Sequence, residues 1–286
     1  MKKISVIGAG VMGRGIAYTA ALRQFDVTLH DIQESSLENA MKQMEADLEK
    51  SIQKGYAKEE DRQLLKRISV TTDFKVAGKD ADLVIEAVLE DIALKIDVFQ
   101  KLDEICPVHT VLATNTSTMS PTEIGARTKR ANQTIAMHFF NPVPRMKLVE
   151  IVRGLDTSDE TYEIVKAVAL QMNKEAIEVN EFPGFVTSRM NCLIGNEAMN
   201  MLMEGVASAE DIDKALKLGL NHPMGPLELA DLVGLDSRLR NMEYLYETLG
   251  EKYRPCPLLI KYVKSGRLGR KSGQGFYDYS KEGVHV

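Results

Sequence analysis

Short apolar runs alternate with longer amphipathic segments through the first 180 residues of the chain. Several runs are β-branched and are bounded by Gly, Asp or Asn, which is typical of buried strands. The predicted strands are Ile4–Ile7, Val27–His30, Leu83–Ile85, Val111–Thr114, Ile135–Met137 and Leu148–Val152. The predicted helices between them include Met12–Arg23, Ser36–Gly55 and Leu94–Ile105. Strands and helices in alternation predict βαβ units, and therefore an α/β fold with a parallel, doubly wound sheet.

A long polar insertion follows the second predicted strand. Residues 36–67 are dense in Lys, Glu, Gln and Met at helical spacing, and Gly55 is a plausible stop between two helices. Such a helical hairpin is longer than a simple crossover requires. Two interpretations stay open: a solvated pair of surface helices, or an arm that holds part of a large substrate. On the second interpretation Lys50 and Lys54, one helical turn apart, are the candidate contacts.

The pattern changes after a last short strand at Ile177–Val179. From Pro183-Gly184 to Gly250 the spacing is helical, and strand signals are nearly absent beyond that point. We therefore expect two domains, an α/β domain over residues 1–183 and an all-α domain over residues 184–286. Four methionines of the second domain indicate an adaptable core or a subunit interface: Met190, Met199, Met201 and Met203.

Composition narrows the class of protein. Hydrophobic residues make up 44% of the 286 residues and charged residues 27%, which is the profile of a globular protein. The net charge of -5 gives no general nucleic-acid footprint, and no apolar run is long enough to cross a bilayer. The three cysteines are widely spaced and form no CxxC pair. We expect a cytoplasmic protein without disulfides, metal, nucleic-acid partner or membrane segment.

A glycine-rich motif stands between the first strand and the first helix. Residues 8–13 read Gly-Ala-Gly-Val-Met-Gly, which is the G-x-G-x-x-G fingerprint of Rossmann-type dinucleotide-binding domains. The first glycine permits the tight turn, the second leaves room for a pyrophosphate, and the third lets helix and strand pack closely. The helix N-terminus attracts the phosphate charge. The residues expected to hold the dinucleotide are Gly8, Gly10, Val11, Met12 and Gly13.

Asp31 indicates which dinucleotide is bound. It ends the second predicted strand, about 20 residues after the glycines, where an acidic residue accepts hydrogen bonds from ribose hydroxyls. The same carboxylate repels the additional phosphate of NADP, so NAD is the expected cofactor. The fingerprint alone also leaves FAD open, because flavoproteins use the same motif.

A histidine and a glutamate lie in neighbouring apolar strands. His138 stands near the end of one strand and is followed by Asn141 and two prolines, which places it at the carboxyl edge of the sheet. Glu150 interrupts the next apolar strand, where a carboxylate is costly unless it is paired. The imidazole is its natural partner. A histidine oriented by a carboxylate can act as a general acid and base.

These residues also carry a family resemblance. The run His-Phe-Phe-Asn-Pro-Val-Pro from His138, with Glu150 and with Ser117 in Ala-Thr-Asn-Thr-Ser, resembles the short-chain 3-hydroxyacyl-CoA dehydrogenases. The similarity is nearly end to end and is strongest to the bacterial 3-hydroxybutyryl-CoA dehydrogenases. It continues through residues 183–186 (Pro-Gly-Phe-Val), 221–226 (Asn-His-Pro-Met-Gly-Pro) and 269–277 (Gly-Arg-Lys-Ser-Gly-Gln-Gly-Phe-Tyr).

The resemblance implies an NAD-dependent interconversion of (S)-3-hydroxybutyryl-CoA and acetoacetyl-CoA, in fatty-acid or butyrate metabolism. It implies that His138 is the catalytic acid and base and that Glu150 is its partner. By the same resemblance Ser117 hydrogen-bonds the substrate oxygen, and Asn141 places the nicotinamide and the reacting carbonyl. It also implies a homodimer.

Further binding residues follow from matching positions. The positions that contact NAD in the family are occupied by Glu90, Lys95 and Lys271, together with Ser117 and Asn141. Lys54 matches a residue that meets coenzyme A in the family, which brings the arm interpretation of the hairpin level with the solvated one. Lys50, one helical turn before it, is the other candidate contact.

Two positions depart from the family pattern. Ser188 stands where the family commonly has an active-site Asn, and its side chain has a shorter reach. Asp47 stands where some members have a Ser that contacts coenzyme A. The change at Ser188 leaves the preferred chain length open, and an acidic residue at position 47 does not help to bind a polyphosphate. The alternatives are a broader 3-hydroxyacyl-CoA dehydrogenase, an L-gulonate dehydrogenase, a crystallin-like NAD-binding protein without catalysis, and an interaction protein built on the helical domain.

Overall fold

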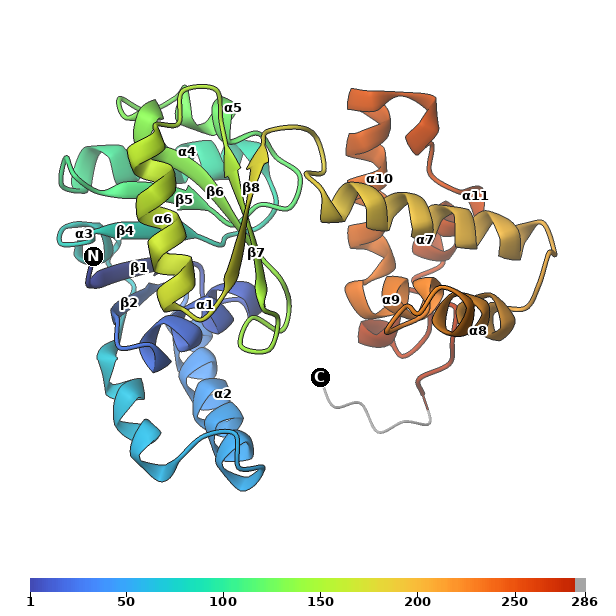
Figure 1. Cartoon of the computed structure of the whole chain (residues 1–286), viewed down its shortest axis with the longest axis horizontal. Helices are drawn as coiled ribbons and strands as arrows, with labels where there is room; N and C mark the ends of the chain where they lie inside the picture. The colour runs from blue at the N-terminus through green and yellow to red at the C-terminus, as the bar shows by residue number, and fades with distance from the viewer. Residues whose placement is uncertain (281–286) are drawn as a thin grey trace. The chain divides into compact units, whose positions relative to one another are not determined.

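The computed structural model describes residues 1–280, and the last six residues of the expected all-α domain lie outside them. The chain divides into two compact units, Met1–Phe182 and a second unit that begins at Pro183 (Figure 1). The first unit contains a single mixed sheet with helices on both faces. The second unit is helical. An α/β fold followed by an all-α region is therefore confirmed.

The sheet of the first unit has eight strands in the order β3-β2-β1-β4-β5-β6-β7-β8. The neighbours from β3 to β6 are parallel, in the strand order of a doubly wound dinucleotide fold. The strands are β1 (Lys3–Ile7), β2 (Asp26–His30), β3 (Ile68–Thr71), β4 (Leu83–Glu86), β5 (Val111–Thr114), β6 (Thr134–Phe139), β7 (Leu148–Arg153) and β8 (Glu175–Asn180).

One end of the sheet corrects the expectation of parallel strands throughout. Strand β7 pairs with β6 in the antiparallel direction, and β8 then pairs with β7 in parallel. Residues 140–147, which connect β6 to β7, are too few for a crossover, so β7 must return beside β6 in the opposite direction. This reversal sets the register of the two strands that carry His138 and Glu150.

Alternate residues of each strand face different helical layers. Val6 belongs to a core cluster with residues of α1 (Val11–Leu22), α2 (Glu34–Gln53) and α6 (Asp159–Gln171). Its neighbour Ile7 belongs to another cluster, with residues of α3 (Phe74–Gly78), α4 (Ile92–Ile105) and α5 (Pro121–Gly125). A sheet buried on both faces explains why its strands read as apolar runs. The short helix η2 (Ala131–Gln133) leads into β6.

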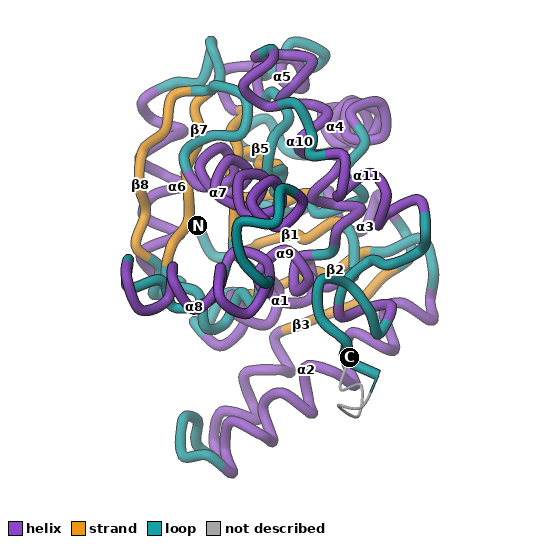
Figure 2. The backbone as a smooth tube through the Cα atoms, turned by 90° about the vertical axis from the view of Figure 1, so that its right-hand side faces the viewer, coloured by secondary structure: helices purple, strands orange, loops and turns teal. Residues whose placement is uncertain are grey.

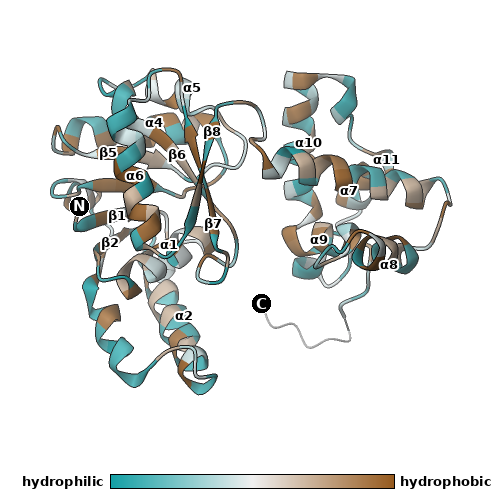
Figure 3. Cartoon of the chain, in the orientation of Figure 1, coloured by the Kyte–Doolittle hydropathy of each residue, from teal (hydrophilic) through white to brown (hydrophobic). Residues whose placement is uncertain are grey.

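The polar insertion is a helical arm with unequal halves. Helix α2 is regular, whereas the second half is the 3-10 helix η1 (Glu59–Arg67). Gly55 lies between them with φ +72°. Figures 1 and 2 both show α2 extending away from the sheet, and Figure 3 shows hydrophilic residues along much of it. Leu37, Met44 and Leu48 are buried on one stripe and attach the arm to the core.

The second unit packs helices around one apolar cluster that includes Met199, Leu227 and Leu245. A buried carboxylate, Asp231, accepts the backbone N–H groups of Phe276 and Tyr277 at 3.0 Å and so ties the last described segment to α9. The helices are α7 (Thr187–Met203), α8 (Ala209–Gly219), α9 (Pro226–Val233), α10 (Leu235–Leu249), η3 (Glu251–Tyr253), α11 (Pro257–Lys264) and η4 (Arg270–Ser272).

Candidate active site

The glycine motif forms the turn between β1 and α1. Gly8 has φ +104°, and a Cβ on Gly13 would lie 1.8 Å from the carbonyl oxygen of Gly8, so a side chain fits at neither position. A Cβ on Gly10 would meet nothing within 4 Å. Helix α1 begins after Gly10 without a side-chain cap and without an acidic residue in its first turn. Open space in front of an uncapped helix N-terminus fits a pyrophosphate.

Asp31 lies directly beside this turn, one residue after β2. Its Oδ2 accepts the N–H of Ala9 at 2.9 Å, and its Oδ1 accepts the N–H of Gln33 at 3.0 Å. The carboxylate therefore holds the glycine turn in place. Each carboxylate oxygen can accept a second hydrogen bond, which leaves capacity for ribose hydroxyls.

The antiparallel register places His138 of β6 directly opposite Glu150 of β7. The imidazole Nδ1 and the carboxylate Oε2 are 2.6 Å apart. Glu150 is fully buried, and only 8% of His138 is exposed. A carboxylate beside Nδ1 holds the proton on that nitrogen, so in the neutral ring Nε2 is the basic atom. The ring of Phe140 lies 4.5 Å from that of His138, centroid to centroid, and restricts its rotation.

Ser117 follows β5 and is tied to Glu90. The Glu90 Oε1 accepts the N–H of Ser117 at 2.9 Å, its hydroxyl at 3.3 Å and the hydroxyl of Thr116 at 2.5 Å. The ammonium of Lys95, which is fully buried, lies 3.3 Å from Glu90 Oε2. Burial by itself would raise the pKa of Glu90, but the Lys95 charge and these hydrogen bonds lower it. Glu90 is thus held as a carboxylate beside Ser117.

Sequence reasoning missed Glu86, which completes this network. Glu86 ends β4 and is fully buried. Its carboxylate accepts hydrogen bonds from Lys95 Nζ at 2.8 Å, Thr114 Oγ1 at 2.6 Å and the N–H of Val88 at 2.7 Å. A carboxylate at the end of the apolar run Leu-Val-Ile-Glu is the same signal that drew attention to Glu150.

The other expected site residues take no part in these hydrogen bonds and ion pairs. Asn141 is exposed, two residues beyond β6, and Lys50 and Lys54 are exposed on the arm. Ser188 and Lys271 belong to the second unit, where Ser188 lies in α7 and Lys271 Nζ lies 2.6 Å from Asp236 Oδ1. Within residues 1–280 no group of three His, Cys, Asp or Glu side chains has the spacing of metal ligands. No helix in that part of the chain is long and apolar enough to span a membrane.

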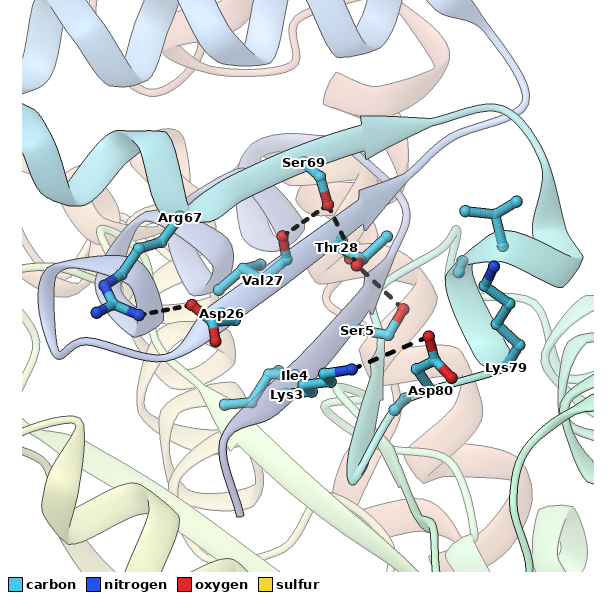
Figure 4. A pocket seen from close by; sticks show the side chains of 13 residues that line it. Lys3, Ile4, Ser5, Asp26, Val27, Thr28, Arg67, Ser69, Lys79 and Asp80 are labelled. Atoms are coloured by element: carbon cyan, nitrogen blue, oxygen red, sulfur yellow. Dashed lines mark hydrogen bonds and ion pairs between the residues drawn. The ribbon is translucent and has the colours of Figure 1, made fainter.

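A pocket opens at the opposite edge of the sheet, along the amino ends of β1, β2 and β3 (Figure 4). Four of its charged side chains form two ion pairs at the surface, Arg67 with Asp26 at 2.5 Å and Lys3 with Asp80 at 3.9 Å. Three hydroxyls line its floor at matching register positions, those of Ser5, Thr28 and Ser69. The expected site residues do not line this pocket, so we assign it no role in catalysis.

The fold and the glycine turn define a dinucleotide-binding domain, and an imidazole–carboxylate pair at the carboxyl edge of its sheet is suited to proton transfer. Comparison with known proteins narrows the class. Residues 3–182 match the profile "3-hydroxyacyl-CoA dehydrogenase, NAD binding domain", and residues 184–279 match "3-hydroxyacyl-CoA dehydrogenase, C-terminal domain". The chain belongs to the 3-hydroxyacyl-CoA dehydrogenase family, and NAD is its cofactor.

Similar proteins match over nearly the whole chain. The "Probable 3-hydroxybutyryl-CoA dehydrogenase" of Bacillus subtilis is 51% identical over 284 residues, covering 99% of each chain. The 3-hydroxybutyryl-CoA dehydrogenase of Clostridioides difficile is 47% identical over 98% of this chain and 100% of its own. The crystal structure of (S)-3-hydroxybutyryl-CoA dehydrogenase from Ralstonia eutropha has a TM-score of 0.93 at 42% identity, covering 98% of this chain and 100% of its own.

Proposed function

We propose that this dehydrogenase interconverts (S)-3-hydroxybutyryl-CoA and acetoacetyl-CoA with NAD. The observation that carries the proposal is the 2.6 Å contact between His138 and Glu150 at the carboxyl edge of an NAD-binding sheet. The names of the similar proteins from Bacillus, Clostridioides and Ralstonia support the four-carbon acyl-CoA substrate.

The proposed mechanism uses His138 as the proton carrier. When bound, NAD supplies the hydride acceptor for oxidation at C3 of the substrate. His138 Nε2 removes the proton of the C3 hydroxyl, and Glu150 stabilises the imidazolium that results. Ser117 and Asn141 hydrogen-bond the substrate oxygen as its charge changes. In the reverse direction His138 returns the proton to that oxygen.

Binding outside the reacting centre follows the same proposal. The glycine turn and Asp31 hold the adenosine half of NAD, and Glu90, Lys95 and Lys271 contact the cofactor. Lys50 and Lys54 of the exposed arm bind the phosphates of coenzyme A, and Ser188 lies near the acyl chain. We further propose a cytoplasmic homodimer formed by the helical unit, in which Met190 and Met203 of α7 are 55% and 46% exposed.

The test is NADH oxidation by the purified protein with acetoacetyl-CoA near neutral pH. Parallel reactions contain NADPH, a longer 3-ketoacyl-CoA, and L-gulonate with NAD. Rapid turnover with NADH and the four-carbon substrate, with slower turnover of the longer one, is the expected result. Demonstrable NAD binding without turnover of either acyl-CoA would overturn the proposal and favour a sugar acid or a non-catalytic role.

Two variants test the binding assignments separately. Asp31→Ser removes the charge that repels the additional phosphate of NADPH, so we expect the preference for NADH to shrink. Ser188→Asn installs the amide common in the family. A change in the ratio of kcat/KM for the two chain lengths would support a place for Ser188 beside the acyl chain, and an unchanged ratio would contradict it.

A further inference from the structure

Lys174 is a buried lysine for which the proposed mechanism has no use. Only 5% of the residue is exposed, and it stands immediately before β8. Its Nζ donates hydrogen bonds to two backbone carbonyls, that of Val143 and, at 2.7 Å, that of Met146. Burial, reinforced by the positive charge of Arg23, lowers the pKa of Lys174 to about 8. A buried ammonium that keeps its proton is stabilised by these two hydrogen bonds, and in turn it holds the backbone segment to which the two carbonyls belong.

Both carbonyls belong to the loop of residues 140–147, which joins the strand of His138 to the strand of Glu150 and carries Asn141. Prolines at 142 and 144 provide no backbone N–H donors. The N–H groups of Arg145 and Met146 both donate to the carbonyl of Pro142 at 3.0 Å. The loop therefore cannot satisfy the Val143 and Met146 carbonyls with these donors, and the Lys174 ammonium satisfies both.

The same loop also packs against helix α1 through the side chain of Val143. Val143 is 2% exposed, and a Cβ on Gly15 of α1 would lie 3.0 Å from the Val143 Cβ and Cγ2 atoms. Helix α1 is the helix that begins at the glycine turn. Two contacts thus hold the loop: the Val143 side chain packs on α1, and the Lys174 ammonium binds two of the loop's carbonyls.

We infer that Lys174 is a positioning residue, whose ammonium fixes the 140–147 loop and thereby the place of Asn141, two residues beyond the strand of His138. The inference rests on the proposed function for its catalytic consequence. Strand pairing does not depend on this side chain, because the backbone N–H of Glu175 donates to the carbonyl of Lys147 at 2.8 Å. Loss of the ammonium should loosen the loop and leave β7 and β8 in register.

The experiment compares Lys174→Met with Lys147→Met. Methionine keeps a stem of similar length without donors, and Lys147 is an exposed lysine at the end of the same loop. We expect Lys174→Met to lower kcat with acetoacetyl-CoA by about 10- to 100-fold, as misplacement of a reacting group does. The affinity for ADP-ribose, the part of NAD that the proposed function assigns to the glycine turn and Asp31, should be unchanged. Lys147→Met should match the wild type in both measurements.

A second measurement follows the mobility of the 140–147 loop by proteolysis and does not depend on activity. Arg145 is exposed in the loop, so trypsin can cleave after it, and we expect faster cleavage at Arg145–Met146 in Lys174→Met than in the wild type. Equal cleavage and equal kcat would overturn the inference. If the wild type itself does not reduce acetoacetyl-CoA, the proposed function fails, while the cleavage rates still decide the role of Lys174.

Rescue by a small amine separates a donor role from a packing role. In Lys174→Ala the lost side chain leaves space for propylamine, which as an ammonium can supply the same hydrogen bonds. We expect added propylamine to restore part of kcat in Lys174→Ala and none in Lys174→Met, where the stem fills the space. Failure to rescue a folded Lys174→Ala protein would mean that the side chain acts by packing alone.

Discussion

Charged side chains lie at both ends of the parallel strands: several are buried at the carboxyl ends (the carboxyl edge), whereas those that line the pocket at the amino ends (the amino edge) are exposed. At the carboxyl edge Glu86, Lys95 and Glu150 are fully buried and His138 nearly so. At the amino edge the Arg67 and Asp26 side chains are 39% and 56% exposed although they form an ion pair. The open pocket lies at the amino edge (Figure 4).

The proposed functional edge is distinguished by buried charged groups, whereas the amino edge has an open pocket lined by exposed charges. Removing a charge from water costs several kcal/mol unless hydrogen bonds and an opposite charge replace the solvent. Glu86 meets that requirement with three donors, and Glu150 meets it with the imidazole of His138. The ion pairs at the amino edge are exposed and require no such arrangement. Changes at the two edges should therefore differ strongly in effect.

The largest difference between the two edges is expected in kcat, when a histidine is removed from each. His138→Ala removes the proton carrier and should lower kcat by about 10²–10⁴-fold. The matched change is His109→Ala, since His109 lies toward the amino edge with its side chain 64% exposed, 3.3 Å from Asp82. Steady-state turnover of acetoacetyl-CoA by both variants checks this. Similar losses in the two variants would contradict the assignment of the carboxyl edge.

The next largest difference is expected in stability, between the loss of a buried lysine at the carboxyl edge and of an exposed lysine at the amino edge. Lys95→Met leaves Glu86 buried without its ammonium and should lower the free energy of unfolding by about 3–5 kcal/mol. Lys3→Met at the amino edge breaks an ion pair to Asp80 that is 3.9 Å long and more than half exposed, and should cost at most about 1 kcal/mol. Urea unfolding of the cofactor-free protein measures both. Equal costs would mean that the buried network contributes no more than a surface pair.

The sequence predicted the pairing at the carboxyl edge on energetic grounds. A glutamate in an apolar strand needs a partner, and His138 was the available one; the two side chains lie 2.6 Å apart. Their roles in catalysis stay predictions. The same argument applied to Glu86 would have found the second buried carboxylate, because Glu86 also ends an apolar strand.

Other features could not be predicted from local pattern. Strand β3 was missed because Ile68–Thr71 is short, and with only Ile68 buried it shows no apolar run. The reversal at β7 depends on the length of the 140–147 loop rather than on the composition of the strand. The contacts of Lys174 join segments 28 and 31 residues apart, and a single lysine before a strand gives no sign of them.

Acid conditions offer a sharper test of the carboxyl edge. The pKa of Glu90 is lowered from its ordinary value of 4.5, so its contribution to stability is fully present above that pH. It is lost as the pH falls through the lower pKa of the folded protein. The stability advantage of the wild type over Glu90→Gln should therefore shrink below pH 4.5. Urea unfolding of both proteins across this range checks the sign, and an advantage that grows toward acid would contradict it.

The smallest effect is expected for the Arg67–Asp26 pair at the pocket rim. The two charges are 2.5 Å apart, yet each keeps much of its hydration, so their coupling should be about 0–1 kcal/mol. A double-mutant cycle with Arg67→Ala and Asp26→Ala, read by urea unfolding, isolates that coupling. Because exposed charges are screened, the coupling should fall further when salt is raised to about 1 M. A coupling of several kcal/mol that does not fall with salt would mean that this exposed pair is as strong as the buried network. The proposed difference between the two edges would then be wrong.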